Sequence, residues 1–261
     1  MKEDIKLIIA CHKKVDVPTD SLYLPLQVGA SGKDSFGFTR DDTGDNISNK
    51  NYAFCELTGY YWAWKNLGCK YIGLVHYRRY FVLKKQKGNP LGSVLKSGDI
   101  DQLIQGNKII LPKKRKYYIE SLYSHYAHTF DGKHLDVARE IIEEKYPEYL
   151  ETFDSTMKQT SGYMFNMFIS SKELSDAYCK WIFDILFELE NRIGYEGMSD
   201  FEKRYPGRIA ERLLNVWVNQ NIEEKDILEL PYIYLGDVNW GKKATSFLKA
   251  KFFHKKYDES F

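Results

Sequence analysis

Residues 55–81, CELTGYYWAWKNLGCKYIGLVHYRRYF, carry the pattern that decides the fold of this chain. In their first half, large apolar side chains recur at helical spacing, at Leu57, Tyr60, Tyr61, Trp64 and Leu67. This spacing predicts a helix with one face packed inward, and Gly68 is placed to end it. The uninterrupted apolar run at residues 71–75 predicts a strand covered on both faces, so the whole stretch predicts an α/β fold.

Charged and aromatic residues follow this predicted strand at once, in the order His76, Tyr77, Arg78, Arg79 and Tyr80. In open α/β sheets, ligands bind outside the carboxyl ends of the strands. Because guanidinium groups match the geometry of phosphate oxygens, the cluster predicts an anionic ligand such as a phosphate or a diphosphate. The alternative is a surface cluster of ion pairs that merely follows a core strand.

A first strand is predicted at residues 5–10, and Ala10, Cys11 and His12 stand at its carboxyl end. Many α/β proteins bind a nucleotide at this place, so these three residues are candidates for contacts to a nucleoside. The sequence contains neither GxGxxG nor GxxxxGK[ST], and it therefore predicts neither a dinucleotide-binding motif nor a P-loop.

Residues 41–51, DDTGDNISNKN, predict a polar loop that leads into the helix described above. The oxygen donors that a hard cation could bind there are Asp41, Asp42, Asp45 and Asn46. The loop does not fit an EF-hand, because its glycine stands too early and the required glutamate is missing. The alternative is a solvated turn rich in Asx residues, with Ser48 as the cap of the next helix.

Residues 123–136 contain three histidines, of which His125 and His128 would share a helix face. There is no HExxH motif or second ligand pair, so hydrogen bonds to sugar hydroxyls or a structural use are favoured over zinc. Residues 161–170 predict a central strand in which Asn166 is a polar side chain among large apolar ones. Such a residue is either satisfied internally or faces a ligand.

Residues 208–221 predict an amphipathic helix with an apolar stripe on one side. Arg208, Glu211 and Arg212 lie three and four positions apart on its other side. A face of this kind is most often ion-paired. If it lines a cleft, Glu211 is a candidate general base that its charged neighbours hold in position.

The 261 residues have an ordinary globular composition, with 43% hydrophobic and 28% charged residues. A net charge of +2 predicts no nucleic-acid partner. Four scattered cysteines without metal-ligand spacing, and no signal peptide, predict reduced thiols in the cytoplasm. No apolar run is long enough to span a bilayer. Residues 240–261 predict a basic amphipathic tail that either binds an anionic membrane surface or packs on its own domain.

The stretches CELTGYYWAWKN and YIGLVHYRRYF closely resemble a bacterial family of capsular and exopolysaccharide synthesis proteins. That family has long been labelled a domain of unknown function and is treated as glycosyltransferases. The resemblance extends to DDTGDNIS, to the segment around His128 and Asp131, to FNMFI and to RIAERLLNVWV, so it covers most of the chain up to about Asp237.

This resemblance implies an α/β domain of the GT-A type at residues 1–239, with a mostly parallel central sheet flanked by helices, plus helical additions. It implies a UDP-sugar donor and an acceptor that is a growing polysaccharide or a lipid-linked glycan at the inner face of the cell membrane. UDP-galactofuranose is a candidate donor, because some members are associated with galactofuranose transfer. Transfer from that α-linked donor would invert to a β-linkage and would need one base.

The resemblance also implies roles for single residues. Glu211 would be the base, and Arg78 and Arg79 would bind the diphosphate with His76 and Tyr77 assisting. The remaining donor contacts would come from Ala10, Cys11, His12, Asp41, Asp42, Asp45, Asn46, Arg208 and Arg212. Contacts to the acceptor would come from Asn166, His128 and Asp131.

The resemblance leaves the metal question open. GT-A enzymes usually hold a divalent metal on the diphosphate with an Asp-x-Asp pair that follows a strand. The corresponding stretch here, residues 76–79, contains no aspartate. Either the arginines stabilise the leaving diphosphate without a metal, or the aspartates of the 41–45 loop hold Mn²⁺ or Mg²⁺.

Two other functions remain open from the sequence. One is a hydrolase or phosphotransferase that acts on a nucleotide sugar. The other is a non-catalytic, glycan-binding scaffold of a polysaccharide assembly complex.

Overall fold

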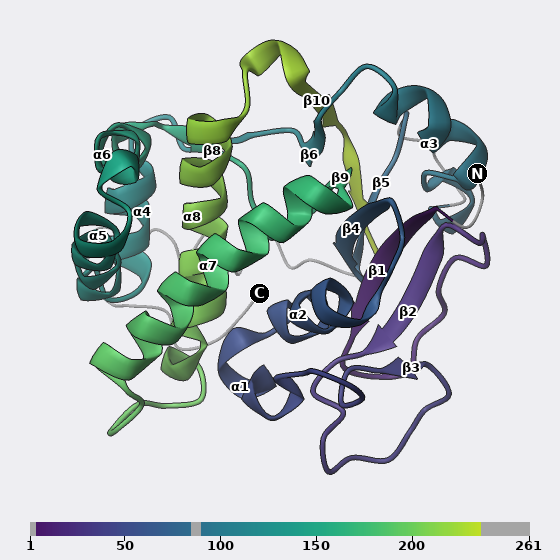
Figure 1. Cartoon of the computed structure of the whole chain (residues 1–261), viewed down its shortest axis with the longest axis horizontal. Coiled ribbons are helices and arrows are strands. Elements are labelled where there is room, and N and C mark those ends of the chain that lie inside the picture. The colour runs from purple at the N-terminus through teal and green to yellow at the C-terminus, as the bar shows by residue number, and fades with distance from the viewer. Residues whose placement is uncertain (1–3, 85–89, 236–261) are drawn as a thin grey trace.

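The computed structural model describes residues 4–84 and 90–235. Strand β1 (Ile5–Cys11) lies inside its main sheet (Figure 1). The other strands of this sheet are β2 (Tyr23–Gln27), β3 (Thr39–Arg40), β4 (Tyr71–His76), β5 (Arg79–Phe81), β6 (Ile109–Pro112), β9 (Phe168–Ser171), β10 (Ile227–Leu230) and β11 (Tyr232–Tyr234). Their order is β10-β6-β9-β4-β1-β2-β3, and β5 pairs with both β4 and β11. A separate ribbon pairs β7 (Arg115–Lys116) with β8 (Ser161–Gly162).

The strand directions place two carboxyl ends side by side. Strand β1 runs parallel to β2 and β4, and β10 runs parallel to β6, whereas β9 is antiparallel to both of its neighbours. The predicted α/β fold with a mostly parallel sheet and flanking helices is thus confirmed. Because Ala10 of β1 pairs with His76 of β4, both strands end at the same edge of the sheet.

Helices cover both faces of this sheet. They are α1 (Asn51–Phe54), α2 (Leu57–Asn66), α3 (Ser97–Ile104), α4 (Leu122–Thr129), α5 (Lys133–Lys145), α6 (Leu150–Lys158), α7 (Lys172–Ile193) and α8 (Tyr205–Asn221). Side chains alternate across a strand, so Ile8 of β1 packs with the cluster of α2, α7 and α8, and Ile9 packs with the cluster of α3. Figure 1 shows α4, α5 and α6 gathered on the far side of α8 from the sheet.

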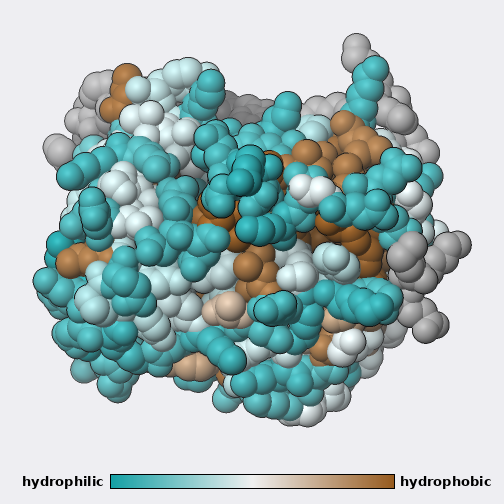
Figure 2. Space-filling model, turned by 45° about the horizontal axis from the view of Figure 1, so that its top comes forward, coloured by the Kyte–Doolittle hydropathy of each residue, from teal (hydrophilic) through white to brown (hydrophobic). Residues whose placement is uncertain are grey.

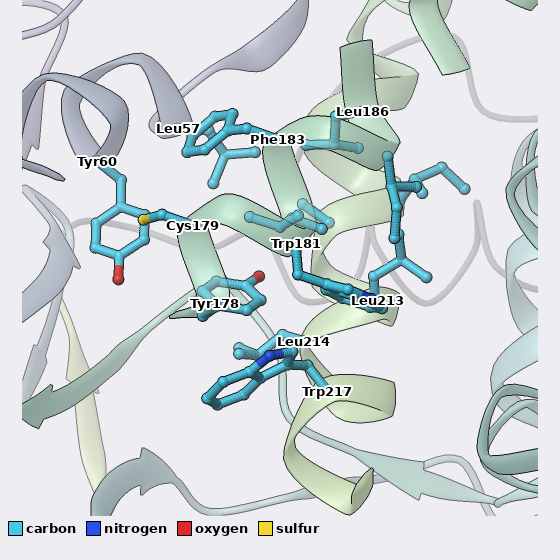
Figure 3. Packing of buried hydrophobic residues seen from close by; sticks show 14 of the residues in the cluster. Leu57, Tyr60, Tyr178, Cys179, Trp181, Phe183, Leu186, Leu213, Leu214 and Trp217 are labelled. Carbon is cyan, nitrogen blue, oxygen red and sulfur yellow. The ribbon is translucent and has the colours of Figure 1, made fainter. Parts of the chain in front are cut away.

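Helix α2 follows the predicted pattern with two shifts. Leu57, Tyr60 and Ala63 form its fully buried face, and Figure 3 shows Leu57 and Tyr60 beside Cys179 and Phe183 of α7. Tyr61 and Trp64 are only half-buried, because α7 covers them from one side. The helix ends at Asn66, before Gly68, since Leu67 already takes an extended backbone.

The strand predicted at residues 161–170 is interrupted, and this prediction was wrong. The structure has β8 and β9 at the two ends of that stretch and a turn between them. Phe165 and Asn166 both take left-handed backbone conformations in the turn, with φ of 77° and 51°. A residue with positive φ cannot continue a strand, so hydrophobicity alone misled the prediction.

Two sequence predictions concern the chain's relation to membranes. Within residues 4–84 and 90–235, no helix is both long enough and apolar enough to cross a bilayer. Figure 2 shows one face of the molecule, where hydrophilic residues predominate and hydrophobic ones form limited patches. The predicted basic tail at 240–261 and the domain boundary after residue 239 lie outside the described residues.

Candidate functional site

Two adjoining cavities lie at the edge of the sheet where β1 and β4 end. The outer cavity has a volume of about 740 Å³, and the inner cavity has a volume of about 230 Å³. Both are lined by Cys55, Glu56, His76, Arg78, Phe201 and Arg204. Residues that line only the outer cavity include Ala10, His12, Asn51, Tyr52 and Tyr77. Residues that line only the inner cavity include Arg79, Arg115, His125, Phe165, Arg208, Glu211 and Arg212.

Two segments that the sequence marked separately meet in the inner cavity. Strand β4, the turn after it and β5 supply His76, Arg78 and Arg79, and α8 supplies Arg208, Glu211 and Arg212 from one face. Positions three and four apart on a helix point the same way, so all three side chains of α8 face the cavity together. The polar face of α8 therefore lines a cleft.

His76 is a neutral hydrogen-bonding group. Its pKa is lowered to about 2, first by burial and then by the charges of Arg79 and Arg78. Its Nδ1 accepts a hydrogen bond of 3.3 Å from the backbone N–H of Arg78. In the neutral ring the proton therefore sits on Nε2, which can donate to a ligand in either cavity.

The inner cavity is strongly basic. Six of its lining residues are arginines, at positions 78, 79, 115, 204, 208 and 212, against the two carboxylates of Glu56 and Glu211. Within residues 4–84 and 90–235, none of the ion pairs involves Arg78, Arg79, Arg115, Arg208 or Arg212. The predicted alternative of a surface ion-pair cluster does not describe these arginines.

Aromatic rings hold these guanidinium groups in place of carboxylates. The guanidinium carbon of Arg79 lies 4.3 Å from the centre of the Phe165 ring, and that of Arg115 lies 5.2 Å from the Tyr117 ring. The guanidinium carbon of Arg208 lies between two rings, 3.9 Å from the centre of the Phe201 ring and 4.2 Å from that of the Phe130 ring. Ring faces attract cations but accept few of their N–H groups, so the edges of the guanidinium groups remain available.

Burial in this setting is costly for the arginines. It lowers the pKa of Arg208 to about 10. Four buried guanidinium nitrogens have no hydrogen-bond partner among the described residues, namely Nε of Arg78, Arg79 and Arg212 and Nη2 of Arg208. Unsatisfied buried donors of this kind are rare in folded proteins, and an anionic ligand would satisfy them.

Two carboxylates, those of Glu56 and Glu211, line the inner cavity. Burial raises the pKa of the Glu211 carboxyl, Arg212 opposes the rise, and Glu56 adds to it. Glu56, at the start of α2, lines both cavities and accepts a hydrogen bond of 2.9 Å from Nδ2 of Asn166. Glu56 is not predicted as a site residue, because a single glutamate before a helix forms no recognisable pattern in the sequence.

Residues with a strained backbone conformation line the inner cavity or lie next to it. Cys55 and Phe165 line the inner cavity and have φ of 53° and 77°, and Asn166 beside them has φ of 51°. For a residue with a bulky side chain this conformation is an outlier, and such strain is concentrated at functional sites in proteins. The Sγ of Cys55 accepts a hydrogen bond of 3.2 Å from Nε of Arg204, which ties the strained turn to the basic wall.

The loop at residues 41–46 lies apart from both cavities. Asp41 is fully buried and accepts hydrogen bonds from the backbone N–H groups of Gly29 and Ala30 and from the hydroxyls of Ser48 and Thr58. Ser48 therefore bonds to Asp41 and does not cap a helix, since the following 3₁₀ turn begins at Ser48 itself with Ile47 as its N-cap.

The other polar side chains of this loop are also engaged locally. Asp42 forms a bidentate ion pair with Arg40, and Asp45 is exposed and accepts from Tyr61. Asn46 bonds to the backbone of the same loop. The four residues serve the structure of the loop in these contacts.

The remaining predicted residues lie at different distances from the cavities. Cys11 is fully buried and lines neither, while the hydroxyl of Tyr77 lies 3.4 Å from Nε2 of His12 in the outer one. His128 pairs with Glu120 at 2.8 Å and lines neither cavity, whereas His125 lines the inner one. Asp131 lines a small cavity of about 100 Å³ that shares Arg208 with the inner one.

The donor set does not fit a divalent metal on a diphosphate. In the described part of the chain, no three His, Cys, Asp or Glu side chains come together as a metal site. Hard cations need several oxygen ligands, and the inner cavity offers two carboxylates among six cationic side chains. What the arrangement can do is bind a polyanion and place a carboxylate beside it.

Comparison with known proteins gives a family and a solved structure. A model of the domain-of-unknown-function family DUF4422 matches residues 6–222. The solved ligand-free structure of the bifunctional glycosyltransferase WbbM superposes with a TM-score of 0.82 at 31% sequence identity. The match covers 90% of this chain and 46% of WbbM, so the chain spans about half the length of that protein. No curated protein matches.

Proposed function

Because the chain belongs to the domain-of-unknown-function family DUF4422 and shares the fold of a glycosyltransferase, we propose that it is itself a glycosyltransferase. It moves a sugar from a UDP-sugar donor to the hydroxyl of a glycan acceptor. The observation that carries this proposal is the basic cleft at the ends of β1 and β4, where buried guanidinium groups lack carboxylate partners.

The outer cavity suits the nucleoside and the cleft between the cavities suits the diphosphate. Ala10 lies near the end of β1 and His12 directly follows this strand. Tyr52, which is 52% exposed, lines the same cavity and offers a ring on which a planar base can stack. Arg78 and Arg204 line both cavities, so they are placed to contact a diphosphate that spans the junction. The sugar then lies in the inner cavity.

The transfer is an inverting displacement. The acceptor hydroxyl attacks the anomeric carbon, the bond from that carbon to the β-phosphate oxygen breaks, and UDP leaves with the electron pair. Glu211 takes the proton of the attacking hydroxyl; its raised pKa brings it closer to the working pH of a general base. Arg78 and Arg79 stabilise the charge that develops on the leaving diphosphate, which is the role that a metal has in other enzymes.

The finer assignments rest on the resemblance described in the sequence analysis. The donor is UDP-galactofuranose, and the acceptor is a capsular polysaccharide or exopolysaccharide precursor carried on a lipid. The enzyme works in the cytoplasm at the inner face of the membrane. These assignments are tested by product analysis, after binding has been established.

Calorimetric titration with UDP, with and without Mn²⁺ or Mg²⁺, tests the proposal. We expect binding that is independent of the metal and lost in Arg78→Ala. Arg139→Ala is the matched control, because Arg139 is ion-paired with Asp154 outside both cavities. Absence of UDP binding under all conditions would overturn the proposal, and binding only with metal would overturn the arginine-based mechanism.

A further inference from the structure

The inner cavity carries more positive charge than one donor needs. Its six arginines face two carboxylates, and His76 stays neutral because its pKa lies at about 2. The diphosphate of a nucleotide sugar bears one negative charge on each phosphate. Excess buried charge of one sign destabilises a folded protein unless a ligand balances it. The surplus therefore calls for a second anion.

The arginines also divide by position. Arg78 and Arg204 line both cavities, where the diphosphate spans the junction, whereas four others line the inner cavity alone, at positions 79, 115, 208 and 212. Arg115 comes from β7, and Arg212 comes from α8, one turn beyond Arg208. The centre of the Tyr117 ring lies 5.2 Å from the guanidinium carbon of Arg115 and 6.0 Å from that of Arg212, so these two arginines lie beside the same ring at one wall of the inner cavity.

Arg212 has the properties of a built anion ligand. Its side chain is buried, with 2% exposed, and its Nε has no hydrogen-bond partner. Its other nitrogens lie 3.3 Å from Sδ of Met164 and 3.5 Å from Nδ1 of His125, both weak or neutral acceptors. A buried guanidinium with such partners destabilises the fold unless an anion joins it, because weak acceptors do not compensate for the lost hydration of the charge.

We infer that the inner cavity has a second anion site, formed by Arg115 and Arg212, that binds an acidic group of the acceptor. The inference rests on the proposed function and adds to it the chemical class of the acceptor, a glycan that bears a phosphate or a carboxylate close to the reacting hydroxyl. Glu211 lies beside Arg212 on α8, so an acceptor fixed by this site presents its hydroxyl near the base.

The test is a titration of the full-length protein, saturated with UDP, with inorganic phosphate and separately with glucuronate. We expect one of these anions to bind with UDP present. Arg115→Gln and Arg212→Gln should each weaken that binding by roughly tenfold or more, the usual effect of one charge-assisted hydrogen bond. Arg115→Gln should also change the affinity for UDP by less than about threefold. The preferred anion tells whether the acceptor carries a phosphate or a carboxylate.

The control variant is Arg78→Gln, which should lose UDP and keep the anion. Two outcomes would overturn the second anion site and leave the proposed donor site standing. In one, neither anion binds the UDP-loaded protein. In the other, Arg115→Gln loses its affinity for UDP and its affinity for the anion together. Should UDP itself not bind, the proposed donor site fails. If the wild type then still binds one of the anions and Arg115→Gln does not, the second anion site is supported without the donor site. Arg115 is only half-buried, so its variant serves if Arg212→Gln does not fold.

Discussion

Nδ2 of Asn166 donates a hydrogen bond of 2.9 Å to Oε1 of Glu56, across 110 positions of the sequence. The same amide nitrogen lies 3.2 Å from the carbonyl oxygen of Gly207 in α8. One side chain thus joins the start of α2, the start of α8 and the strained turn before β9. The ring of Phe165 in that turn also covers the guanidinium of Arg79, so the turn orients groups of both charges.

Replacing Asn166 by glycine separates the geometry of the site from the stability of the fold. Glycine takes the φ of 51° without strain, which offsets part of the loss of two hydrogen bonds, so we expect the free energy of unfolding to fall by no more than about 1 kcal/mol. Turnover should fall by about tenfold to a hundredfold, because the turn that places Phe165 against the Arg79 guanidinium loses its anchor. Tyr118→Gly is the control, since Tyr118 also has positive φ but is 83% exposed and outside both cavities. Unchanged turnover in Asn166→Gly would refute the role of the turn.

Arg78 should be needed as an arginine and not only as a charge. Arg78→Ala should reduce turnover by about a thousandfold and leave the thermal unfolding midpoint close to that of the wild type. Arg78→Lys keeps the charge but loses the fork of donors that fits a diphosphate, so it should recover only a small part of the rate. Full activity of either variant in a sugar-transfer assay would contradict the assignment.

Glu211→Gln should stabilise the protein while it abolishes turnover. Between the ordinary and the raised pKa, the folded state holds a proton that the unfolded state has lost, so stability falls as the pH rises through this window. Removing the carboxyl should raise the unfolding midpoint by about 2–4 °C at neutral pH and have little effect near pH 4. Thermal unfolding at both pH values checks this. A lower midpoint for the variant at neutral pH would show that Glu211 is stabilised as a carboxylate.

Asp41→Asn should lower the stability of the fold and should not change how activity responds to a divalent metal. Both carboxylate oxygens of Asp41 now accept hydrogen bonds, and the amide of asparagine would place N–H groups against one set of these donors. We therefore expect the free energy of unfolding, measured by chemical denaturation, to fall by about 2–4 kcal/mol. Asp45→Asn, at an exposed position of the same loop, should stay within about 0.5 kcal/mol of the wild type. If Asp41→Asn instead kept full stability and lost a metal-dependent activity, the loop would be a metal site after all.

The parts of this site that lie on a regular helix or strand could be predicted from the pattern of residues in the sequence. The apolar run before His76 and the helical spacing from Arg208 to Arg212 both mark the direction in which side chains point, and the two segments meet in the inner cavity. Phe165 and Asn166 could not be predicted, because hydrophobicity favours a strand there and only tertiary contacts hold a bulky residue at positive φ. The same holds for Asp41, whose partners are backbone groups that the fold brings together.

Strand β9 lies between β4 and β6 in the sheet, although it follows β6 in the chain by more than fifty residues. During synthesis, β1 to β4 can pair as soon as the first 76 residues are available, while β6 has no neighbour until β9 arrives. Pairing across such separations is slow, because the loop must close before any contact is gained. The basic residues after β4 are thus covered last, and the binding cleft is completed only when the second half of the chain has folded onto the first.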